Sequence, residues 1–315
     1  MKILVLGAGA VGSALGARLA ADGHDVELLG RPEHGAAVRA HGLTVEGVGA
    51  GVYFLRAPAD LRSAQSPEAV LLGVKTFDLE RASRELGTRF PELVPTLLPQ
   101  NGLRVEPRVA GPLRETSGAE PGPWLVRAVG SVPVTLLAPG VVRQAGTGEI
   151  VLHDPERSGD AERSTRQWGE LLEHAGVPVR WVTDLDRELW RKALVNAAIN
   201  PLTALHRIPN GALAEEPYRT EARQLLREAQ EAARLAGFSI SDGEADEELA
   251  RVVRATAENR SSMLQDVEHG RPTEIDAISG EILRTAKEHG VDLPATRRVV
   301  ERVRAIAATA RTQPS

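Results

Sequence analysis

The 315-residue chain contains no cysteine, which excludes disulfide bonds, thiol catalysis and thiolate metal sites. It also lacks any apolar run of about 18 residues, the length that a membrane-spanning helix requires. Its eight histidines show no spacing typical of metal ligands, so we predict no metal site. The net charge of -5 argues against nucleic acid or an anionic membrane surface as the main partner.

We expect no signal peptide, because an apolar segment follows directly after Met1 and Lys2. We therefore expect a cytoplasmic protein. Hydrophobic residues make up 42% of the chain and charged residues 26%, which is ordinary for a globular protein. The length is sufficient for two domains, each with a core of its own.

A glycine-rich segment, GAGAVG, follows an apolar run at residues 3–6 that is typical of a central parallel strand. Helical periodicity begins directly after it. In a dinucleotide-binding turn, Gly7 allows the tight turn, Gly9 lets a pyrophosphate approach the backbone, and Gly12 lets helix and strand pack closely. The first turn of the helix presents N–H groups to the phosphates. We therefore predict a cofactor-binding loop made of Gly7, Ala8, Gly9, Ala10, Val11 and Gly12.

The end of the second predicted strand, residues 26–29, indicates which dinucleotide binds. An NAD site usually has an acidic residue there for the ribose 2′-hydroxyl, whereas an arginine accommodates the 2′-phosphate of NADP. This chain has Gly30-Arg31, and the acidic residue close by, Glu27, lies in the middle of the strand. We predict NADPH with Arg31 as the partner of the 2′-phosphate, although an exposed arginine of no special role is the alternative.

Two further predicted strands, residues 69–74 and 96–98, end in polar residues. Lys75 follows the first strand, and Asn101 lies just beyond the second, in the sequence Gln-Asn-Gly. Ligands of open parallel sheets bind just past the carboxyl ends of the strands. We therefore predict that Lys75 and Asn101 line the nicotinamide end of the cofactor site, although Asn-Gly alone is more often a plain turn.

The remainder of the first half predicts an α/β domain that extends to about Asp184. A strand pair is expected within residues 42–55, and residues 110–123 are expected to form a flexible loop because they are rich in Gly, Pro and Ser. Further expected elements are strands at residues 125–129, 132–137, 141–144, 149–152 and 179–182 and a helix at residues 160–174.

The second half, residues 185–315, predicts an all-α domain. We expect helices at residues 218–236 and 245–269, a third that Thr273 caps with Glu274 in its first turn, and a last one from Pro294. On the second of these helices, Asn259, Ser262 and Asp266 would share one face. The long helices with apolar faces would suit a homodimer.

One helix of this half carries an unusual polar stripe. In the segment ELWRKALVNAAINPLTAL, residues 188–205, the residues between Lys192 and Asn200 are apolar except for Asn196. Lys192, Asn196 and Asn200 stand at i, i+4 and i+8 and so share one face of a helix that is otherwise apolar and should be buried. Buried polar groups require a polar partner, and a bound ligand is one. Pro201 is expected to end the helix.

Lysine is scarce in this chain, with only Lys2, Lys75, Lys192 and Lys287 among 38 lysines and arginines. A desolvated lysine releases a proton near neutral pH and arginine does not, so Lys192 is a candidate general acid. The alternative is that Lys192 is a solvated lysine and the two asparagines are capping or hinge residues.

Taken together, these segments resemble the ketopantoate reductases, which are 2-dehydropantoate 2-reductases. The resemblance covers nearly the whole chain and rests on GAGAVG, Lys75, Gln-Asn-Gly at 100–102, ELWRKALVNAAINPLTAL, ENRSSMLQDV at 258–267 and PTEIDAISG at 272–280. It implies an N-terminal Rossmann domain, residues 1–184, and a helical domain, residues 185–315, with the active site between them. It also implies NADPH-dependent reduction of ketopantoate, a 2-oxo acid, to (R)-pantoate in pantothenate biosynthesis.

The resemblance assigns roles to residues of this chain. Lys192 matches the catalytic lysine, which gives a proton to the ketone oxygen, and Glu274 matches the acid that binds the substrate hydroxyl. Glu274 is also expected to contact the cofactor, as are Arg31 and Lys75. The positions expected to contact substrate are Asn101, Asn196, Asn200, Asn259 and Ser262. The segment 110–123 looks longer than the family pattern, which puts the alignment there in doubt.

Two other functions are the alternatives to this interpretation. A reductase of the same superfamily could act on a different 2-oxo acid or branched ketone, because the motifs define the type of reaction better than the pocket for the substrate's side chain. A non-catalytic NADPH-binding regulator would show a degraded polar stripe, but Lys192, Asn196, Ser262 and Glu274 are all present.

Overall fold

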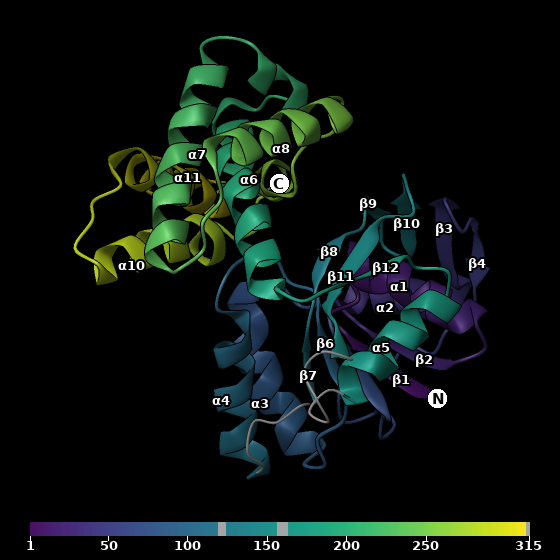
Figure 1. The fold of residues 1–315 in the computed structure, drawn as a ribbon. Coiled ribbons are helices and arrows are strands. Elements are labelled where there is room, and N and C mark those ends of the chain that lie inside the picture. Colours follow the sequence, from purple (N-terminus) through teal and green to yellow (C-terminus); the bar gives the residue numbers. More distant parts are fainter. Residues whose placement is uncertain (119–123, 156–162, 313–315) are drawn as a thin grey trace. The chain divides into compact units, whose positions relative to one another are not determined.

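The computed structural model describes residues 1–118, 124–155 and 163–312, and the chain forms two units (Figure 1). The first unit contains residues 1–100 and 105–185. The second contains residues 186–315 and a short segment, Asn101–Arg104, that comes from the middle of the first. Each unit has a hydrophobic core of its own.

A five-stranded parallel sheet forms the centre of the first unit, with the strand order β2-β1-β5-β6-β7. Its strands, in chain order, are β1 (Lys2–Leu6), β2 (Asp25–Leu29), β5 (Ala69–Leu72), β6 (Thr96–Leu98) and β7 (Leu125–Arg127). The helices of this unit are α1 (Ala10–Ala21), α2 (Pro32–His41), α3 (Leu79–Arg89), α4 (Val105–Ser117) and α5 (Arg163–His174).

Both faces of this sheet are covered. Successive residues of a strand point to opposite faces of the sheet, and on β1 the two sets of residues lie in two different cores. Ile3 and Val5 of β1 belong to a core that includes residues of α1 and α5. Leu4 and Leu6 belong to a second core that includes residues of α3 and α4. Strands buried on both faces are apolar throughout, which explains the continuous apolar runs in the sequence.

Two smaller sheets complete the first unit. One has the order β4-β3-β10-β9, and the other has the order β12-β11-β8. The predicted strand pair within residues 42–55 is confirmed by β3 and β4, which pair in antiparallel fashion. The bounds are β3 (Leu43–Gly47), β4 (Gly51–Tyr53), β8 (Val129–Ser131), β9 (Val134–Ala138), β10 (Val141–Gln144), β11 (Glu149–His153) and β12 (Val179–Val182).

The flexible loop predicted at residues 110–123 is wrong for residues 110–117, which form most of α4. Val109 and Leu113 of this helix are buried against α3, and that packing outweighs the weak helix propensity of Gly111 and Pro112. Residues 119–123 of the predicted loop, and residues 160–162 of the helix predicted at residues 160–174, lie outside the described part of the chain.

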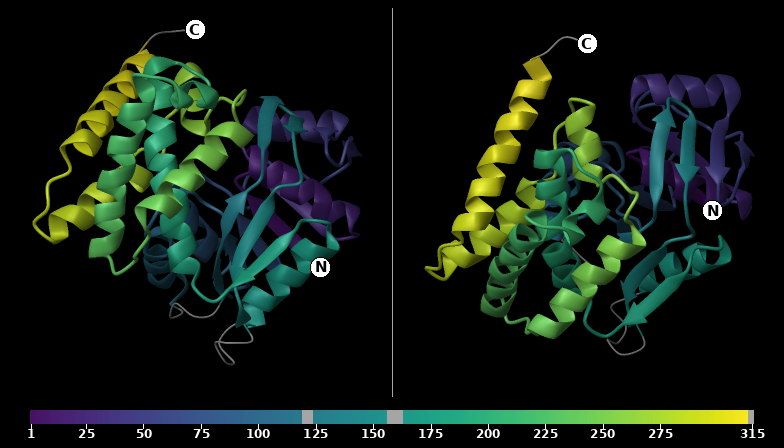
Figure 2. Two further views of the ribbon diagram at one scale, coloured as in Figure 1. Left: turned by 45° about the horizontal axis from the view of Figure 1, so that its top comes forward. Right: turned by 90° about the horizontal axis from the view of Figure 1, so that it is seen from above.

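The second unit is helical (Figure 2). Residues of α6 make up much of its core, together with residues of α7, α8, α10 and α11. The bounds are α6 (Leu185–His206), a 3-10 turn at Asn210–Ala214, α7 (Tyr218–Leu235), α8 (Asp242–Ala255), α9 (Ser262–Glu268), a π-helical turn at Asp276–Gly280, α10 (Glu281–Glu288) and α11 (Pro294–Thr312).

Three details of the helical unit correct the sequence prediction. Helix α6 does not end at Asn200 but continues through Pro201 to His206, because the fully buried residues Leu202 and Thr203 hold the last turns in the core. The single helix predicted at residues 245–269 is two helices. Ser261 caps the second of them by accepting a hydrogen bond from the N–H of Leu264. The helix predicted from Thr273 begins later, so Glu274 precedes the π-helical turn.

The predicted architecture is confirmed: a Rossmann-type domain precedes a helical domain. Across the described ranges, no helix is both long and apolar enough to cross a membrane. Within the same residues, no group of three or more histidine, cysteine, aspartate or glutamate side chains is placed to hold a metal ion.

Candidate active site

The glycine loop of the first unit is held tightly against the sheet at its two outer glycines. Gly7 has a φ of +106°, and a Cβ there would lie 2.2 Å from the backbone nitrogen of Val74. A Cβ on Gly12 would lie 2.5 Å from the carbonyl oxygen of Gly7. Both positions therefore require glycine for close packing of the backbone.

Gly9 differs from these two, because a Cβ at that position would meet nothing within 4 Å. Gly9 is also the N-cap of α1, and no side chain accepts a hydrogen bond at this helix end. The first turn of α1 contains no acidic residue. The loop thus leaves backbone N–H groups and open space at a helix N-terminus, which fits the pyrophosphate of a dinucleotide.

Arg31 lies beyond the end of β2, where it is the N-cap of α2, and its side chain is exposed. The preceding residue, Gly30, packs on the loop, because a Cβ there would lie 2.8 Å from the carbonyl oxygen of Ala8. The amide N–H groups of Gly7 and Ala8 both donate to the carbonyl oxygen of Leu29. Hydrogen bonds and close packing therefore hold the start of α2 against the glycine loop.

Lys75 follows β5 and is half-buried. The segment before it is held by Gln100, a buried residue that follows β6. The Gln100 amide nitrogen donates to the carbonyl oxygen of Val74 at 3.1 Å and to that of Leu72. Gln100 was not among the predicted site residues, although it directly precedes the predicted residue Asn101.

The polar stripe of the second unit lies on α6 as predicted. Lys192 and Asn196 are half-buried, and Asn200 is buried. Burial lowers the pKa of Lys192 from 10.5 to about 8, and the negative charge of Glu274 opposes that effect. The structure therefore brings Lys192 and Glu274 close enough for their charges to interact, although they are 82 positions apart in the sequence.

The segment that carries Glu274 is fixed by contacts within the second unit. Glu274 is buried, and its carbonyl oxygen accepts hydrogen bonds from the amides of Ala277 and Ile278. The carbonyl oxygen of Ala277 in turn accepts a hydrogen bond of 3.0 Å from the amide of Leu103. Asn101, which begins the same short segment as Leu103, therefore belongs to the same unit as Glu274.

Asn259 and Ser262 do not share a helix face, because the chain is not helical between α8 and α9. Asn259 is exposed in this break, and its carbonyl oxygen accepts a hydrogen bond from the amide of Asn210. Ser262 is exposed at the first position of α9. The predicted face of Asn259, Ser262 and Asp266 is thus wrong, since Asp266 is buried and paired with Arg271 at 3.0 Å.

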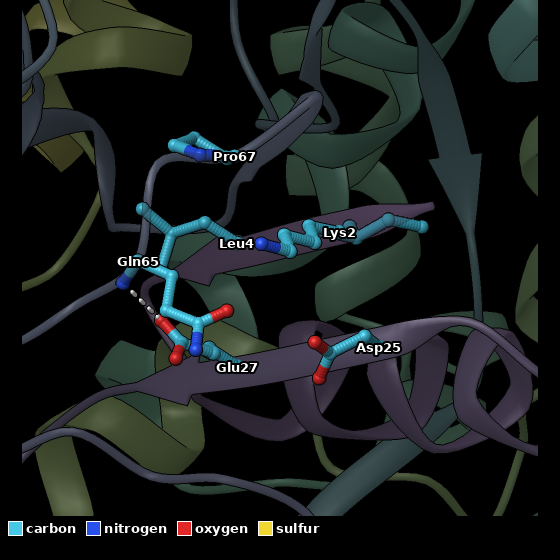
Figure 3. Close-up of a pocket in the computed structure, with 7 residues that line it drawn as sticks. Lys2, Leu4, Asp25, Glu27, Gln65 and Pro67 are labelled. Atoms are coloured by element: carbon cyan, nitrogen blue, oxygen red, sulfur yellow. Dashed lines mark hydrogen bonds between the residues drawn. The ribbon is translucent and has the colours of Figure 1, made fainter.

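The cavity shown in Figure 3 lies apart from these residues. It has a volume of about 10 Å³, about enough for one water molecule, and it is lined by residues that include Lys2, Asp25 and Glu27. Lys2 and Asp25 begin β1 and β2, whereas the glycine loop follows the opposite end of β1. Glu27 accepts a hydrogen bond of 2.9 Å from the amide of Gln65 and pairs with Arg56, so its carboxylate is already engaged there.

Comparison with known proteins gives one consistent result. Residues 3–157 match the family model described as ketopantoate reductase PanE/ApbA, and residues 184–307 match the model of its C-terminal domain. The 2-dehydropantoate 2-reductase of Archaeoglobus fulgidus is 32% identical over 311 residues, which cover 97% of each chain.

Solved structures show the same fold. A PanE/ApbA family ketopantoate reductase from Ralstonia eutropha JMP134 has a TM-score of 0.86 at 30% identity, covering 98% of this chain and 99% of that one. A D-mandelate dehydrogenase, solved with NADH and anilino(oxo)acetate, has a TM-score of 0.87 at 22% identity, covering 99% of this chain and 100% of that one. At that identity the likeness concerns the fold alone.

The chain has a Rossmann-type domain with an open glycine loop and a helical domain with a half-buried lysine, and its match to a reductase family over both domains shows that it is an oxidoreductase. Because two family models together match most of its length, the chain belongs to the ketopantoate reductase family. The resemblance stated from the sequence motifs is therefore confirmed.

Proposed function

We propose that this protein reduces 2-dehydropantoate to (R)-pantoate with NADPH, as a step of pantothenate biosynthesis. The observation that carries the proposal is the half-buried Lys192 within electrostatic reach of the buried Glu274 in the second unit. Family membership and relatives about 30% identical, which are named 2-dehydropantoate 2-reductases, support the choice of substrate.

Lys192 would be the general acid. When a ketone is reduced, a hydride reaches the carbonyl carbon and negative charge develops on the oxygen. The bound nicotinamide supplies that hydride. The Lys192 ammonium would stabilise the oxygen and then transfer a proton to it, which leaves a hydroxyl group and a neutral amine. A pKa of about 8 suits this role, because the lysine is protonated at pH 7 and still acidic enough to release its proton.

Glu274 would keep Lys192 charged and bind the substrate's hydroxyl group. Without a nearby carboxylate, burial alone would lower the lysine pKa further. We further propose that Asn196 and Asn200 of α6, together with Asn101, Asn259 and Ser262, bind the polar groups of the substrate.

In the first unit, the residues fit a bound dinucleotide. The N–H groups around Gly9 would hold the pyrophosphate, and Lys75 would lie toward the nicotinamide. The exposed guanidinium of Arg31 would pair with the 2′-phosphate, since no acidic side chain follows β2 directly. We therefore propose NADPH as the preferred cofactor.

The test is the oxidation of NADPH on addition of ketopantoate, followed by absorbance, with NADH and other 2-oxo acids in parallel. We expect fast oxidation with NADPH and ketopantoate, and a Lys192→Ala variant should lose at least about 100-fold in kcat because a general acid contributes that much. Lys287→Ala is the matched control, since Lys287 is an exposed lysine of the same unit. Near-normal turnover by Lys192→Ala would refute the role of the lysine, and turnover of a different 2-oxo acid alone would refute the substrate.

A further inference from the structure

A buried pair, Ser13 and His34, joins the first two helices of the nucleotide-binding domain. Ser13 is 0% exposed and His34 is 3% exposed. Their side chains are 3.0 Å apart, between the Ser13 hydroxyl oxygen and Nε2 of His34. On the other side of the ring, the amide N–H of Gly140 donates to Nδ1 at 3.0 Å. The proposed reaction assigns no role to Ser13 or His34.

The contacts determine which nitrogen carries the proton. Burial lowers the pKa of His34 below its usual value, so the ring is neutral at pH 7. Because the Gly140 amide donates to Nδ1, that nitrogen accepts and the proton is on Nε2. His34 therefore donates to the Ser13 hydroxyl, and all of its hydrogen-bonding capacity is used.

This bond connects two parts of the predicted cofactor site. Ser13 lies in α1, one residue after Gly12 of the glycine loop. His34 is the third residue of α2, whose N-cap is Arg31, and the carbonyl oxygen of Arg31 accepts a hydrogen bond of 3.0 Å from the amide of Gly35. The backbone of Arg31 is thus held between Gly30, which packs on Ala8, and His34, which is bonded to α1.

We propose that His34 is a positioning residue for cofactor choice: through Ser13 it holds the start of α2 against the glycine loop and so aims Arg31 at the 2′-phosphate. This inference rests on the proposed use of NADPH. An exposed arginine side chain is flexible, and a salt bridge that it forms gains strength when its backbone is fixed. Loss of the imidazole would leave the buried Ser13 hydroxyl and the buried Gly140 N–H without this partner, and loss of the hydroxyl would leave Nε2–H of His34 without one. In either case the start of α2 would shift or loosen.

The test measures binding of NADPH and NADH separately, by titration of cofactor fluorescence without substrate. His34→Leu removes the imidazole, and Ser13→Ala removes the bond from the other side with almost no change in volume. We expect each variant to raise the Kd for NADPH about three- to tenfold and to leave the Kd for NADH within about twofold, since a weakened charge-assisted contact affects only the ligand with the phosphate. His41→Leu, at the exposed end of the same helix, is the matched control.

A double-mutant cycle separates positioning from general loosening of the fold. In an Arg31→Ala background, His34→Leu and Ser13→Ala should not raise the Kd for NADPH any further. Equal losses for both cofactors, or an undiminished loss in the Arg31→Ala background, would refute the inference. Failure of the unmodified protein to bind either cofactor would instead refute the proposed function.

Discussion

The lowered pKa of Lys192 should be measurable as a cost to stability. A pKa of about 8 in the folded protein, against an ordinary value of 10.5, means that folding disfavours the ammonium form. At about 1.4 kcal/mol per pKa unit, the cost is about 3 kcal/mol. Below pH 8 both the folded and the unfolded chain hold this proton, so the full cost applies. Between pH 8 and 10.5 the unfolded chain holds more of it, and the cost declines to zero.

Lys192→Met replaces the ammonium by an apolar side chain of similar length and should remove this cost. We expect the variant's free energy of unfolding, relative to the unmodified protein, to be about 3 kcal/mol higher at pH 7 than the same difference at pH 10.5. Differences in packing contribute equally at both pH values and cancel from this comparison. Urea denaturation at the two pH values measures it, with Lys287→Met as the exposed control.

An identical difference at pH 7 and pH 10.5 would show that the pKa of Lys192 is not lowered, and the proposed general acid would lose its physical basis. A larger stability gain at pH 10.5 than at pH 7 would indicate the opposite, a lysine whose charge is stabilised by folding. The predicted result would also show that the chain gives up stability at the residue that we assign to proton transfer.

Two further predictions concern the loop and the helical unit. Gly9→Ala should keep the free energy of unfolding within about 1 kcal/mol, since its Cβ meets no atom within 4 Å, but should raise the Kd for NADPH about tenfold or more. Gly12→Ala should instead lower the free energy of unfolding by about 1–3 kcal/mol. If urea denaturation showed Gly9→Ala to be the less stable of the two variants, this account of the loop would be contradicted. Thr203→Val should cost about 1–3 kcal/mol, because the Thr203 and Ser261 hydroxyls are 2.7 Å apart in a buried contact. Thr203→Ser should retain most of that stability, and a larger loss in Thr203→Ser than in Thr203→Val would mean that the methyl group, not the hydroxyl, is what matters.

The sequence predicted the structure best where the residues that determine an element are adjacent in the chain. The glycine loop could be predicted because strand, turn and helix are adjacent in the chain, and each glycine has a steric role there. The polar stripe of α6 was evident because it interrupts an otherwise apolar helix. Fold class and family followed from these segments.

The errors arose where tertiary contacts outweigh local preference. Helix α4 contains Gly111 and Pro112, which suggest a loop, yet its apolar face packs on α3. The break between α8 and α9 is held by hydrogen bonds from the amides of Asn210 and Gly211 to its carbonyl groups and by the capping hydroxyl of Ser261. Local signals of this size are easily misjudged from the sequence alone.

Some contributors to the site could not be predicted, because their partners are distant in the sequence. His34 contacts Ser13 and Gly140, which are 21 and 106 residues away. Gln100 holds the carbonyl groups of Leu72 and Val74. A single histidine or glutamine in the sequence gives no sign of such contacts until the chain is folded.

The short segment Asn101–Arg104 makes the second unit discontinuous along the chain. Leu103 is part of that unit's core, and Arg104 forms an ion pair with Glu288 of α10. During synthesis, these four residues emerge long before the helices that they join, so the core of the helical unit is completed by residues from two separate parts of the chain. A fragment that begins at residue 186 would lack Leu103 in its interior and the ion pair of Arg104, so we expect it to be less stable than the helical unit of the whole chain.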